Sequence, residues 1–544
     1  MGRKLGIDLG TTYSCVSYVD ETGVTRIIDP IEGGGYTTPS VVYFDPDGTN
    51  VVVGATARTE GALNPENVVE RVKNYMGDPN YTLFINGNQY SPAAVSSIIL
   101  KKLINDAEEH FGGEEIEGVV ITCPAYFGDH ERDATRLAGE NVTLRNGEKL
   151  KVFQLLDEPV AAALAYGNNC HEDMSKQILI YDLGGGTFDC TVMKIDFVGG
   201  DRKMEVITTH GNHQLGGKDW DAAIAEYVRN EFCNATGEDP DEMANDPEQN
   251  QWFSENIEKA KITLSRKDTV SLTPNYNGNK SKVELTRQIF DEQTSSLLNQ
   301  TTMLIDEMLA LKGMSMADID EIVLVGGSTR MPQVTEKLKN EYGKPISSFE
   351  PDKAVAMGAA LVASGMGYSA DKAAAGATTG TGAGDVDVGG AIVVEGIPGE
   401  TTTIIVKCTK SYGLVASRYD SDEEFIANII FKDTEKPAEQ TRRFGTSVAN
   451  QTGLNLRVYE NSSLEKDVTF EESKQLYEAC VVDLTPGLPK GAPIEITFKL
   501  DASGVFSIVA LDVTNNISKE VVPVKIGAEA TTTGMDFAAD AVLN

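Results

Sequence analysis

The sequence of 544 residues lacks long apolar runs and is short of basic side chains. No segment approaches the roughly 18 apolar residues that a membrane-spanning helix needs, and the N-terminus shows no apolar region of a signal peptide. Its 47 lysines and arginines are outnumbered by 82 acidic residues, which gives a formal net charge of −35. Because nucleic acid is bound by neutralising its phosphates, this charge argues against nucleic acid and anionic membranes as partners. We therefore expect a cytoplasmic protein.

The sequence also lacks the cysteine spacing of a metal site and the glycine pattern of a P-loop. Its seven cysteines are scattered and odd in number, with no C-x-x-C pair or Cys/His cluster. No G-x-x-x-x-G-K-[S/T] segment occurs, and no G-x-G-x-x-G follows a strand pattern. Phosphate binding in this chain would therefore depend on other glycine turns.

Two short segments far apart in the chain carry nearly the same pattern. They read GIDLGTTY (6–13) and YDLGGGTFD (181–189), and each follows an apolar run typical of a strand. Glycine allows a tight turn whose N–H groups approach a ligand, and successive N–H groups form an anion-binding nest. An aspartate at the end of a strand can hold a metal ion through water. Together the two segments predict a clamp on the phosphates of a nucleotide.

Secondary-structure patterns divide the chain into four parts. Alternating strand and helix patterns from residue 3 to about residue 366 predict an α/β architecture with helix-covered sheets. A segment rich in Gly, Ala and Thr follows and predicts a flexible linker. Short alternating strands between turn residues are then typical of an antiparallel β-sandwich, and a small-residue tail is expected to be disordered. The boundaries that we predict are 1–367 for the α/β domain, 368–403 for the linker, 404–526 for the sandwich and 527–544 for the tail.

Further glycine turns occur at Gly216–Gly217 and at residues 326–330. Duplicated hairpins with such turns are typical of the actin-like ATPase superfold, which has two lobes built on duplicated ribonuclease-H-like units. That superfold also contains sugar kinases and filament proteins, so the pattern alone does not select one function.

Ten collinear segments of the α/β part resemble the seventy-kilodalton heat-shock chaperones, the DnaK-like family. They include GIDLGTTYSCV (6–16), NPENVVERVKNYMG (64–77), LLDEPVAAALAYG (155–167), DLGGGTFDCTV (182–192) and PDKAVAMGAAL (351–361). The resemblance implies ATP or ADP as the nucleotide, Mg²⁺ as the metal ion and K⁺ as a further candidate ion.

The resemblance also implies a role for individual residues. Asp8, Glu158 and Asp182 would arrange Mg²⁺, mostly through water, together with the attacking water molecule. Lys73 would contact the γ-phosphate, and Thr187 would hydrogen bond to phosphate oxygens. Phosphoryl transfer needs positioning and charge neutralisation more than covalent chemistry, which agrees with these residue types. Taken alone, Glu158 would fit an acid at a helix start, Lys73 a solvated surface charge, and Asp189 either a site residue or a turn cap.

The other nucleotide-contacting positions lie in the glycine turns and in a nucleoside pocket. By resemblance they are Gly10, Thr11, Thr12, Tyr13, Gly184, Gly185, Gly186, Gly216, Gly217, Glu258, Lys261, Ser265, Gly326, Gly327, Ser328, Arg330 and Asp352. Ile262 departs from the family, which usually has an arginine there that packs against adenine. Loss of that cation–π contact, worth about 0.5–2 kcal/mol, predicts weaker nucleotide binding and faster exchange. Asp157 is a second departure, where asparagine is usual.

Residues 404–526 resemble the peptide-binding β-domain of the same family, more loosely than the α/β part. An extended peptide would lie there with its backbone hydrogen bonded and an apolar side chain in a pocket. The same residues would also fit ordinary sandwich core positions. By position they are Leu414, Phe425, Phe444, Thr446, Leu454, Leu456 and Val505.

Two features of the family are missing from the sequence. The acid-and-leucine linker between the domains is reduced to residues 404–406, without the acid, which puts coupling between the domains in doubt. No helical lid is expected after residue 526, so bound peptide should escape faster.

These features predict an ATP-dependent, DnaK-like chaperone that binds extended apolar segments of unfolded polypeptides. The resemblance implies a J-domain co-chaperone and a nucleotide-exchange factor as partners. One alternative is a kinase for a small molecule on the same superfold. Another is a degenerate, lidless nucleotide-binding module that docks a partner without a folding cycle.

Overall fold

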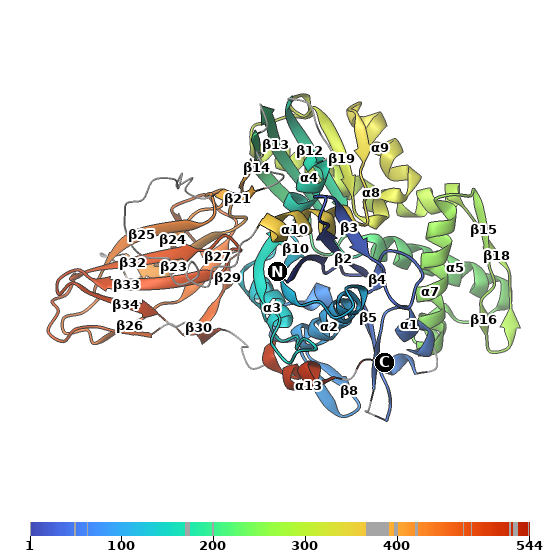
Figure 1. Ribbon diagram of the computed structural model, residues 1–544, viewed down its shortest axis with the longest axis horizontal. Coiled ribbons are helices and arrows are strands. Elements are labelled where there is room, and N and C mark those ends of the chain that lie inside the picture. The colour runs from blue at the N-terminus through green and yellow to red at the C-terminus, as the bar shows by residue number, and fades with distance from the viewer. Residues whose placement is uncertain are drawn as a thin grey trace.

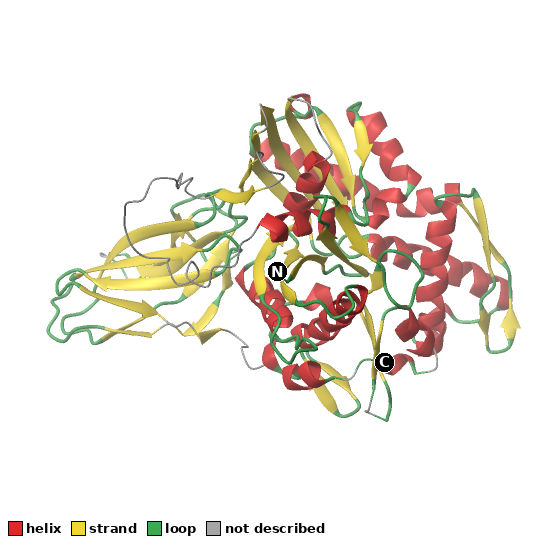
Figure 2. Ribbon diagram, in the orientation of Figure 1, coloured by secondary structure: helices red, strands yellow, loops and turns green. Residues whose placement is uncertain are grey.

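The computed structural model has an α/β body with an elongated β region beside it (Figure 1). Figure 2 shows that the helices lie in the body, whereas the β region consists of strands and loops. The structure describes residues 2–47, 50–61, 64–168, 174–198, 201–365, 391–395, 401–418, 421, 423–471, 473–479, 481–521, 524–525, 531–541 and 543.

The first sheet of the body holds the first glycine hairpin. Its strand order is β11-β10-β1-β2-β3, with β4 paired to β2. β1 pairs in parallel with β10 and antiparallel with β2. The strands are β1 (Arg3–Asp8), β2 (Tyr13–Val19), β3 (Thr25–Ile28), β4 (Thr38–Pro39), β10 (Ile116–Cys123) and β11 (Val152–Asp157).

The second sheet repeats this arrangement around the second hairpin. Its order is β20-β19-β12-β13-β14-β22-β21. β12 pairs in parallel with β19 and antiparallel with β13, as β1 does with β10 and β2. The predicted duplication is therefore present in the topology. The strands are β12 (Met174–Leu183), β13 (Phe188–Val198), β14 (Asp201–Asn212), β19 (Glu321–Val325), β20 (Ile346–Ser348), β21 (Ala391–Glu395) and β22 (Thr401–Ile405).

Two helices of small residues, α4 (Glu158–Asn168) and α10 (Ala354–Gly365), pack between the two sheets. Their buried alanines allow close approach, and Gly358 shows how close it is. A Cβ on Gly358 would lie 1.8 Å from the carbonyl oxygen of Ala161, so no larger residue fits. This core fixes the ends of β1 and β12 relative to each other.

The remaining helices lie around the two sheets and beside the shorter strands of the body (Figure 1). Among the described residues, no helix combines the length and apolar content that crossing a membrane requires. The main helices are α1 (Ala55–Gly61), α2 (Pro92–His110), α3 (Asp129–Glu140), α5 (Gly217–Thr236), α6 (Pro240–Ala244), α7 (Pro247–Leu264), α8 (Arg287–Leu311) and α9 (Pro332–Tyr342). Short strands accompany them: β5 (Val41–Phe44), β6 (Val51–Val53), β7 (Val68–Glu70), β8 (Leu83–Ile85), β9 (Asn88–Tyr90), β15 (Thr269–Leu272), β16 (Asn275–Tyr276), β17 (Asn279–Lys280) and β18 (Val283–Thr286).

The described residues from 406 to 525, called here the C-terminal β region, contain two main sheets. Their orders are β28-β24-β23-β27-β29 and β25-β32-β33-β34, and one apolar core contains side chains from both. The inward residues of β32 and β33 alternate with outward ones, as expected for a sheet buried on one face. The strands are β23 (Ser411–Ser417), β24 (Glu424–Ile430), β25 (Ala438–Gly445), β26 (Gly453–Asn455), β27 (Val458–Asn461), β28 (Asp467–Val468), β29 (Lys474–Gln475), β30 (Tyr477–Ala479), β31 (Val481–Asp483), β32 (Pro493–Leu500), β33 (Phe506–Asp512), β34 (Ile517–Val521) and β35 (Val524–Lys525).

The prediction of a flexible linker over 368–403 is wrong for the end of that segment. β22 pairs in parallel with β14, and β21 pairs with β22, so both strands extend the second sheet. β14 would otherwise present an open edge, and the β-branched residues of 401–405 have the propensity to pair with it. Residues 368–390, on which the linker prediction mainly rests, lie outside the described residues.

The prediction of a disordered tail over 527–544 is wrong for α13 (Met535–Asp540) and its flanks. Met535 and Ala538 are buried in the same core cluster as α2, and the Phe537 ring packs edge-on against Tyr90. Lys101 on α2 donates to the carbonyl oxygens of residues 539 and 541, at 2.9 and 2.7 Å. Apolar side chains on one side of this six-residue helix thus supply the burial that composition alone did not suggest. Figure 1 shows α13 beside α2 in the body.

The C-terminal β region contacts α3 through a cluster of acidic side chains. The Tyr477 hydroxyl donates to Asp129 at 3.1 Å, and Lys474 pairs with Glu131 at 3.1 Å. Glu460 on β27 is buried close to Glu131. One oxygen of each of these two glutamates is buried and has no hydrogen-bond partner among the described residues.

The Glu460 carboxyl makes the stability of this contact depend on pH. Burial and the negative charge of Glu131 raise the pKa of Glu460 to about 7, although Lys474 opposes the shift. Because the folded-state pKa lies above the unfolded value, the protonated carboxyl stabilises the fold at low pH, and this is lost as the pH rises through 7. We expect the free energy of unfolding to fall by up to about 3 kcal/mol between about pH 5 and pH 8 through this group.

The replacement Glu460→Gln keeps the shape and removes the titration. We expect its melting temperature to fall less than that of the parent protein over the same pH range, measured by scanning calorimetry. An unchanged pH slope in this variant would show that Glu460 does not titrate in this range.

Candidate active site

Three carboxylates meet where the two sheets adjoin. Asp8 is the last residue of β1, Asp182 lies near the end of β12, and Glu158 begins α4. Glu158 and Asp182 are buried. Ends of strands at such a junction are where ligands bind in open α/β sheets. The duplicated topology therefore brings Asp8 together with Glu158 and Asp182, from which the sequence separates it by more than a hundred positions.

Lys73 is the cation of this group. It lies in a short 3-10 helix, η2 (Val72–Tyr75), is buried, and donates from Nζ to Oε1 of Glu158 at 2.6 Å. Burial opposes its charge, but Glu158 and Asp8 outweigh that effect and raise the pKa of Lys73. Lys73 is thus charged and aimed at the carboxylates, which rules out a solvated surface position.

The carboxylates repel one another in the structure. Removal from water and the charge of Glu158 raise the pKa of Asp8 to about 7, and the same causes raise the pKa of Asp182 well above its ordinary range. Burial likewise raises the pKa of Asp189, whose Oδ1 has no hydrogen-bond partner among the described residues. Such a set of hard oxygen donors fits a divalent cation. No three His, Cys, Asp or Glu side chains within the described ranges are close enough to ligate one ion directly.

The glycine turns of the two hairpins face each other at this point. A Cβ on Gly185 would lie 1.9 Å from Oγ1 of Thr12, and one on Gly186 would lie 2.7 Å from the Thr11 side chain. A third turn joins them, because a Cβ on Gly216 would lie 2.4 Å from the carbonyl carbon of Gly186. The turns thus form one continuous cradle of backbone that has room only for glycine.

The residues predicted for the nucleoside flank this cradle. Ser328 donates to the carbonyl oxygen of Gly184 at 2.9 Å, which attaches the turn at 326–330 to the second hairpin. Arg330 pairs with Asp352. Lys261 on α7 donates to the Gly217 carbonyl at 3.1 Å and to Asp221 at 2.8 Å. The remaining predicted positions, Gly10, Gly327 and Ser265, lie in the same turns or beside Lys261.

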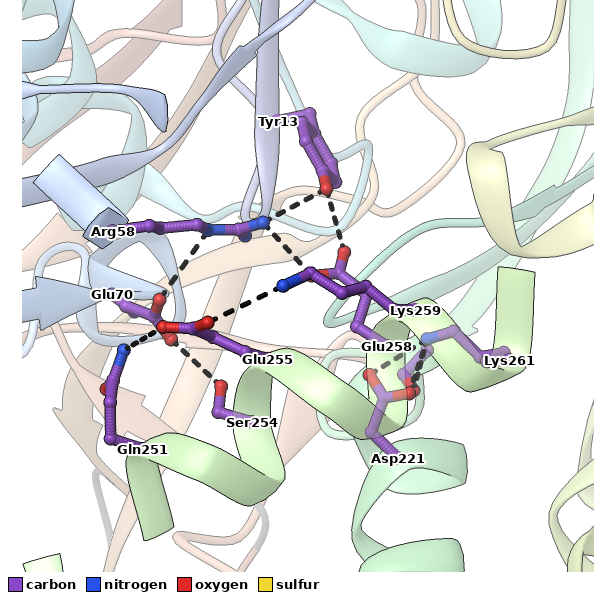
Figure 3. Close-up of polar contacts among 11 residues, drawn as sticks. Tyr13, Arg58, Glu70, Asp221, Gln251, Ser254, Glu255, Glu258, Lys259 and Lys261 are labelled. Atoms are coloured by element: carbon purple, nitrogen blue, oxygen red, sulfur yellow. Dashed lines mark hydrogen bonds and ion pairs between the residues drawn. The ribbon is translucent and has the colours of Figure 1, made fainter. Parts of the chain in front are cut away.

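A polar bridge joins the two halves of the body between α1 and α7 (Figure 3). The Tyr13 hydroxyl donates to Glu258 on α7 at 2.9 Å. Arg58 on α1 donates to Tyr13 at 3.1 Å and to Glu258 at 3.0 Å. Burial and the charge of Glu258 raise the pKa of Tyr13 to about 12, so its hydroxyl stays a donor.

Arg58 and Asp221 are members of this site that the sequence analysis missed. Arg58 pairs with Glu258 across 200 positions, and Asp221 pairs with Lys261 across 40. No local motif links the partners in either pair. Ile262, in contrast, lies beside Lys261 on α7 with about half of its surface exposed (47%).

Four of the residues predicted to bind peptide lie together in the C-terminal β region. Leu414 and Leu456 belong to its core, and Phe444 and Leu454 pack partly exposed against that core. The other three lie apart from this cluster. Thr446 is buried and donates to the Pro489 carbonyl at 2.6 Å, Phe425 lies under the Arg418 guanidinium, and Val505 adjoins the contact between Phe506 and Asp129.

Comparison with known proteins gives two consistent findings. A family model described as Hsp70 protein matches residues 4–367. The chain is 35% identical over 518 residues to the chaperone protein DnaK of Thermotoga petrophila, an alignment that covers 93% of this chain and 78% of that protein. Chaperone protein DnaK of Thermotoga maritima and of Thermotoga neapolitana match to the same extent.

Proposed function

The chain belongs to the Hsp70 family, and from this premise we propose that it is an ATP-dependent, DnaK-like chaperone. It binds and hydrolyses ATP and binds extended apolar segments of unfolded polypeptides, and thereby assists protein folding. The observation that carries the proposal is the convergence of two glycine turns on buried carboxylates beside Lys73. Its ATP and ADP are bound with Mg²⁺, as is general in the family, and K⁺ is a further candidate ion.

The domain organisation supports this function. Residues 1–367 form the actin-like ATPase domain, with one lobe on each sheet, and the C-terminal β region forms the peptide-binding β-sandwich. β22 joins the two and marks the start of the sandwich near residues 404–406. Among the described residues after β35, α13 is six residues long and takes no part in a lid.

In the ATPase domain, the glycine turns hold the phosphates through backbone N–H groups, and Thr11, Thr12 and Thr187 add hydroxyl donors. Mg²⁺, when bound, neutralises charge on the phosphates. Asp8, Asp182 and Glu158 would hold it, mostly through water, and Glu158 would also orient the attacking water. Lys73 binds the γ-phosphate and stabilises the charge that develops on it.

In the sandwich, Phe444 and Leu454, the partly exposed members of the apolar cluster, provide the surface for an apolar side chain of the peptide, and Leu414 and Leu456 belong to the core against which they pack. Main-chain hydrogen bonds hold the extended peptide, and the pocket selects the side chain. The family premise adds a J-domain co-chaperone and a nucleotide-exchange factor as partners.

The proposal is tested by measuring ATP hydrolysis with and without an extended apolar peptide in excess. We expect turnover that the peptide stimulates. Turnover that the peptide does not change would favour the nucleotide-binding docking module instead, and no turnover would remove the ATPase assignment.

Ile262→Arg tests the assignment of the nucleoside pocket. The guanidinium would stack on adenine and gain about 0.5–2 kcal/mol. We expect ATP and ADP to bind about 2- to 30-fold more tightly, measured by isothermal titration calorimetry. Ile262→Leu is the matched control and should leave the dissociation constants unchanged. If Ile262→Arg binds ATP and ADP with the same affinity as the parent protein, adenine binds elsewhere.

A further inference from the structure

Asp157 is the centre of a buried ion cluster between the ATPase domain and the sandwich. It accepts from Nη2 of Arg132 at 2.6 Å and from Nζ of Lys436 at 3.4 Å. All three side chains are at least 95% buried. Arg132 belongs to α3, whereas Lys436 belongs to the C-terminal β region, 279 positions away from Asp157.

A second contact fixes the same strand. Ser503 of the C-terminal β region accepts from the Leu155 backbone N–H at 3.2 Å through Oγ, and from Arg132 at 3.1 Å through its carbonyl oxygen. β11 is an edge strand of the first sheet, so Leu155 has its N–H free for this bond. The sandwich therefore holds β11 at two points, Leu155 and Asp157.

The charge of Asp157 is what allows Lys436 to be buried here. A buried ammonium group without a carboxylate costs several kcal/mol. An asparagine at position 157, the residue that the family usually has, would leave the two cations Arg132 and Lys436 next to an uncharged amide. The aspartate at this position thus matches the lysine on the sandwich, because its two carboxylate oxygens accept separately from Arg132 and Lys436.

Asp157 also lies next to Glu158, one of the residues proposed for the ATPase site. It ends β11, and the next residue, Glu158, begins α4 and pairs with Lys73. Any movement of Asp157 with the sandwich therefore displaces the backbone that carries Glu158. A shift of about 1 Å at a catalytic group can change the rate about 100-fold.

We propose that Asp157 is a positioning residue, which binds Lys436 of the docked sandwich and thereby sets the position of Glu158. The proposal rests on the proposed function, because it describes how docking of the sandwich reaches the ATPase site.

The experiment uses the full chain with Asp157→Asn, Lys436→Met, both replacements together, and Lys436→Glu. Docking of the sandwich is measured as the hydrogen-exchange rate of the Leu155 amide in the absence of nucleotide. Coupling between the domains is measured as the ratio of ATP turnover with apolar peptide to ATP turnover without it. We expect Asp157→Asn and Lys436→Glu each to raise the exchange rate at Leu155 by about tenfold or more and to abolish the peptide response. Lys436→Met should suppress part of the Asp157→Asn effect, because it removes the unpaired ammonium.

Asp433→Asn is the matched control. Asp433 pairs with Lys312 at 2.6 Å, another ion pair between the two domains, whose partner on the body is the C-cap residue of α8 and not a residue of β11. Its backbone is left-handed (φ 70°), which asparagine also tolerates. We expect this variant to keep both the peptide response and the protection of Leu155.

The outcomes distinguish a failure of the contact between Asp157 and Lys436 from a failure of the proposed function. The proposed contact between Asp157 and Lys436, called here the Asp157 anchor, is wrong in either of two cases. One is that Asp157→Asn raises the exchange rate at Leu155 equally with and without Lys436→Met. The other is that Lys436→Glu leaves the Leu155 amide protected. If exchange rises in Asp157→Asn but the peptide response is kept, docking does not act through Asp157 on Glu158. Absence of ATP turnover in the parent protein would overturn the proposed function, while the exchange measurement still decides the anchor.

Discussion

Lys73→Ala is expected to lower ATP turnover by about 10²- to 10³-fold, the loss typical when one charged donor to a developing oxyanion is removed. Lys73 is a buried cation that the structure places against Glu158, with the carboxyl groups of Asp8 and Asp182 nearby. With the γ-phosphate bound, the same ammonium group can stabilise charge on the transferred group. The glycine cradle does not depend on Lys73, so ATP should still bind.

Turnover of the Lys73 variant is best measured as a single-turnover rate, at concentrations above the dissociation constant for ATP, so that the ATP is bound. Removal of the lysine leaves Glu158 buried without its cation, so melting temperatures with and without ATP must show that the variant is folded. Lys102→Ala is the matched control, since Lys102 is also ion paired, to Asp106 on α2. Intact turnover in Lys73→Ala would make the catalytic assignment of this residue wrong.

The meeting of the glycine turns could be predicted because its parts are local. Asp8 and Asp182 each precede a glycine turn after an apolar strand, and the successive N–H groups of such a turn can form an anion-binding nest. The duplication then implied that the two turns meet. The topology of the two sheets, in which β1 and β12 have equivalent neighbours, fulfils that implication.

The contacts between distant segments could not be predicted. Arg58 in α1 and Lys436 in the C-terminal β region each pair with a carboxylate more than a hundred positions away, and an isolated basic residue is most often solvated. Asp157 was noted only as a departure from the family. Its partner is visible only when the sandwich is placed against β11.

The linker and the tail were misjudged for a related reason. Composition measures whether a segment can bury enough apolar area by itself. Residues 401–405 and α13 do not need to bury apolar area by themselves, because β14 and α2 supply the other half of each contact. Both segments attach the C-terminal β region to the ATPase domain, one before it and one after it.

Ala538→Asp is expected to detach the second of these attachments. Ala538 is fully buried against α2, and a carboxylate there would lie in an apolar cluster with Met535. The cost of burying that charge exceeds what a six-residue helix gains by docking, so the segment should release rather than hold the charge. We expect a loss of about 2–4 kcal/mol in the free energy of unfolding, measured by denaturant titration.

Release should also make residues 531–541 accessible to limited proteolysis, while the site around Lys73 keeps its affinity for ATP. Asp536→Asn is the matched control, because Asp536 is exposed on the same helix and its replacement changes the charge without touching α2. A variant with unchanged stability and a protected C-terminal segment would show that α13 contributes no binding energy. Because β22 would still hold the start of the C-terminal β region, loss of α13 alone should leave Leu155 protected, which distinguishes this attachment from the Asp157 anchor.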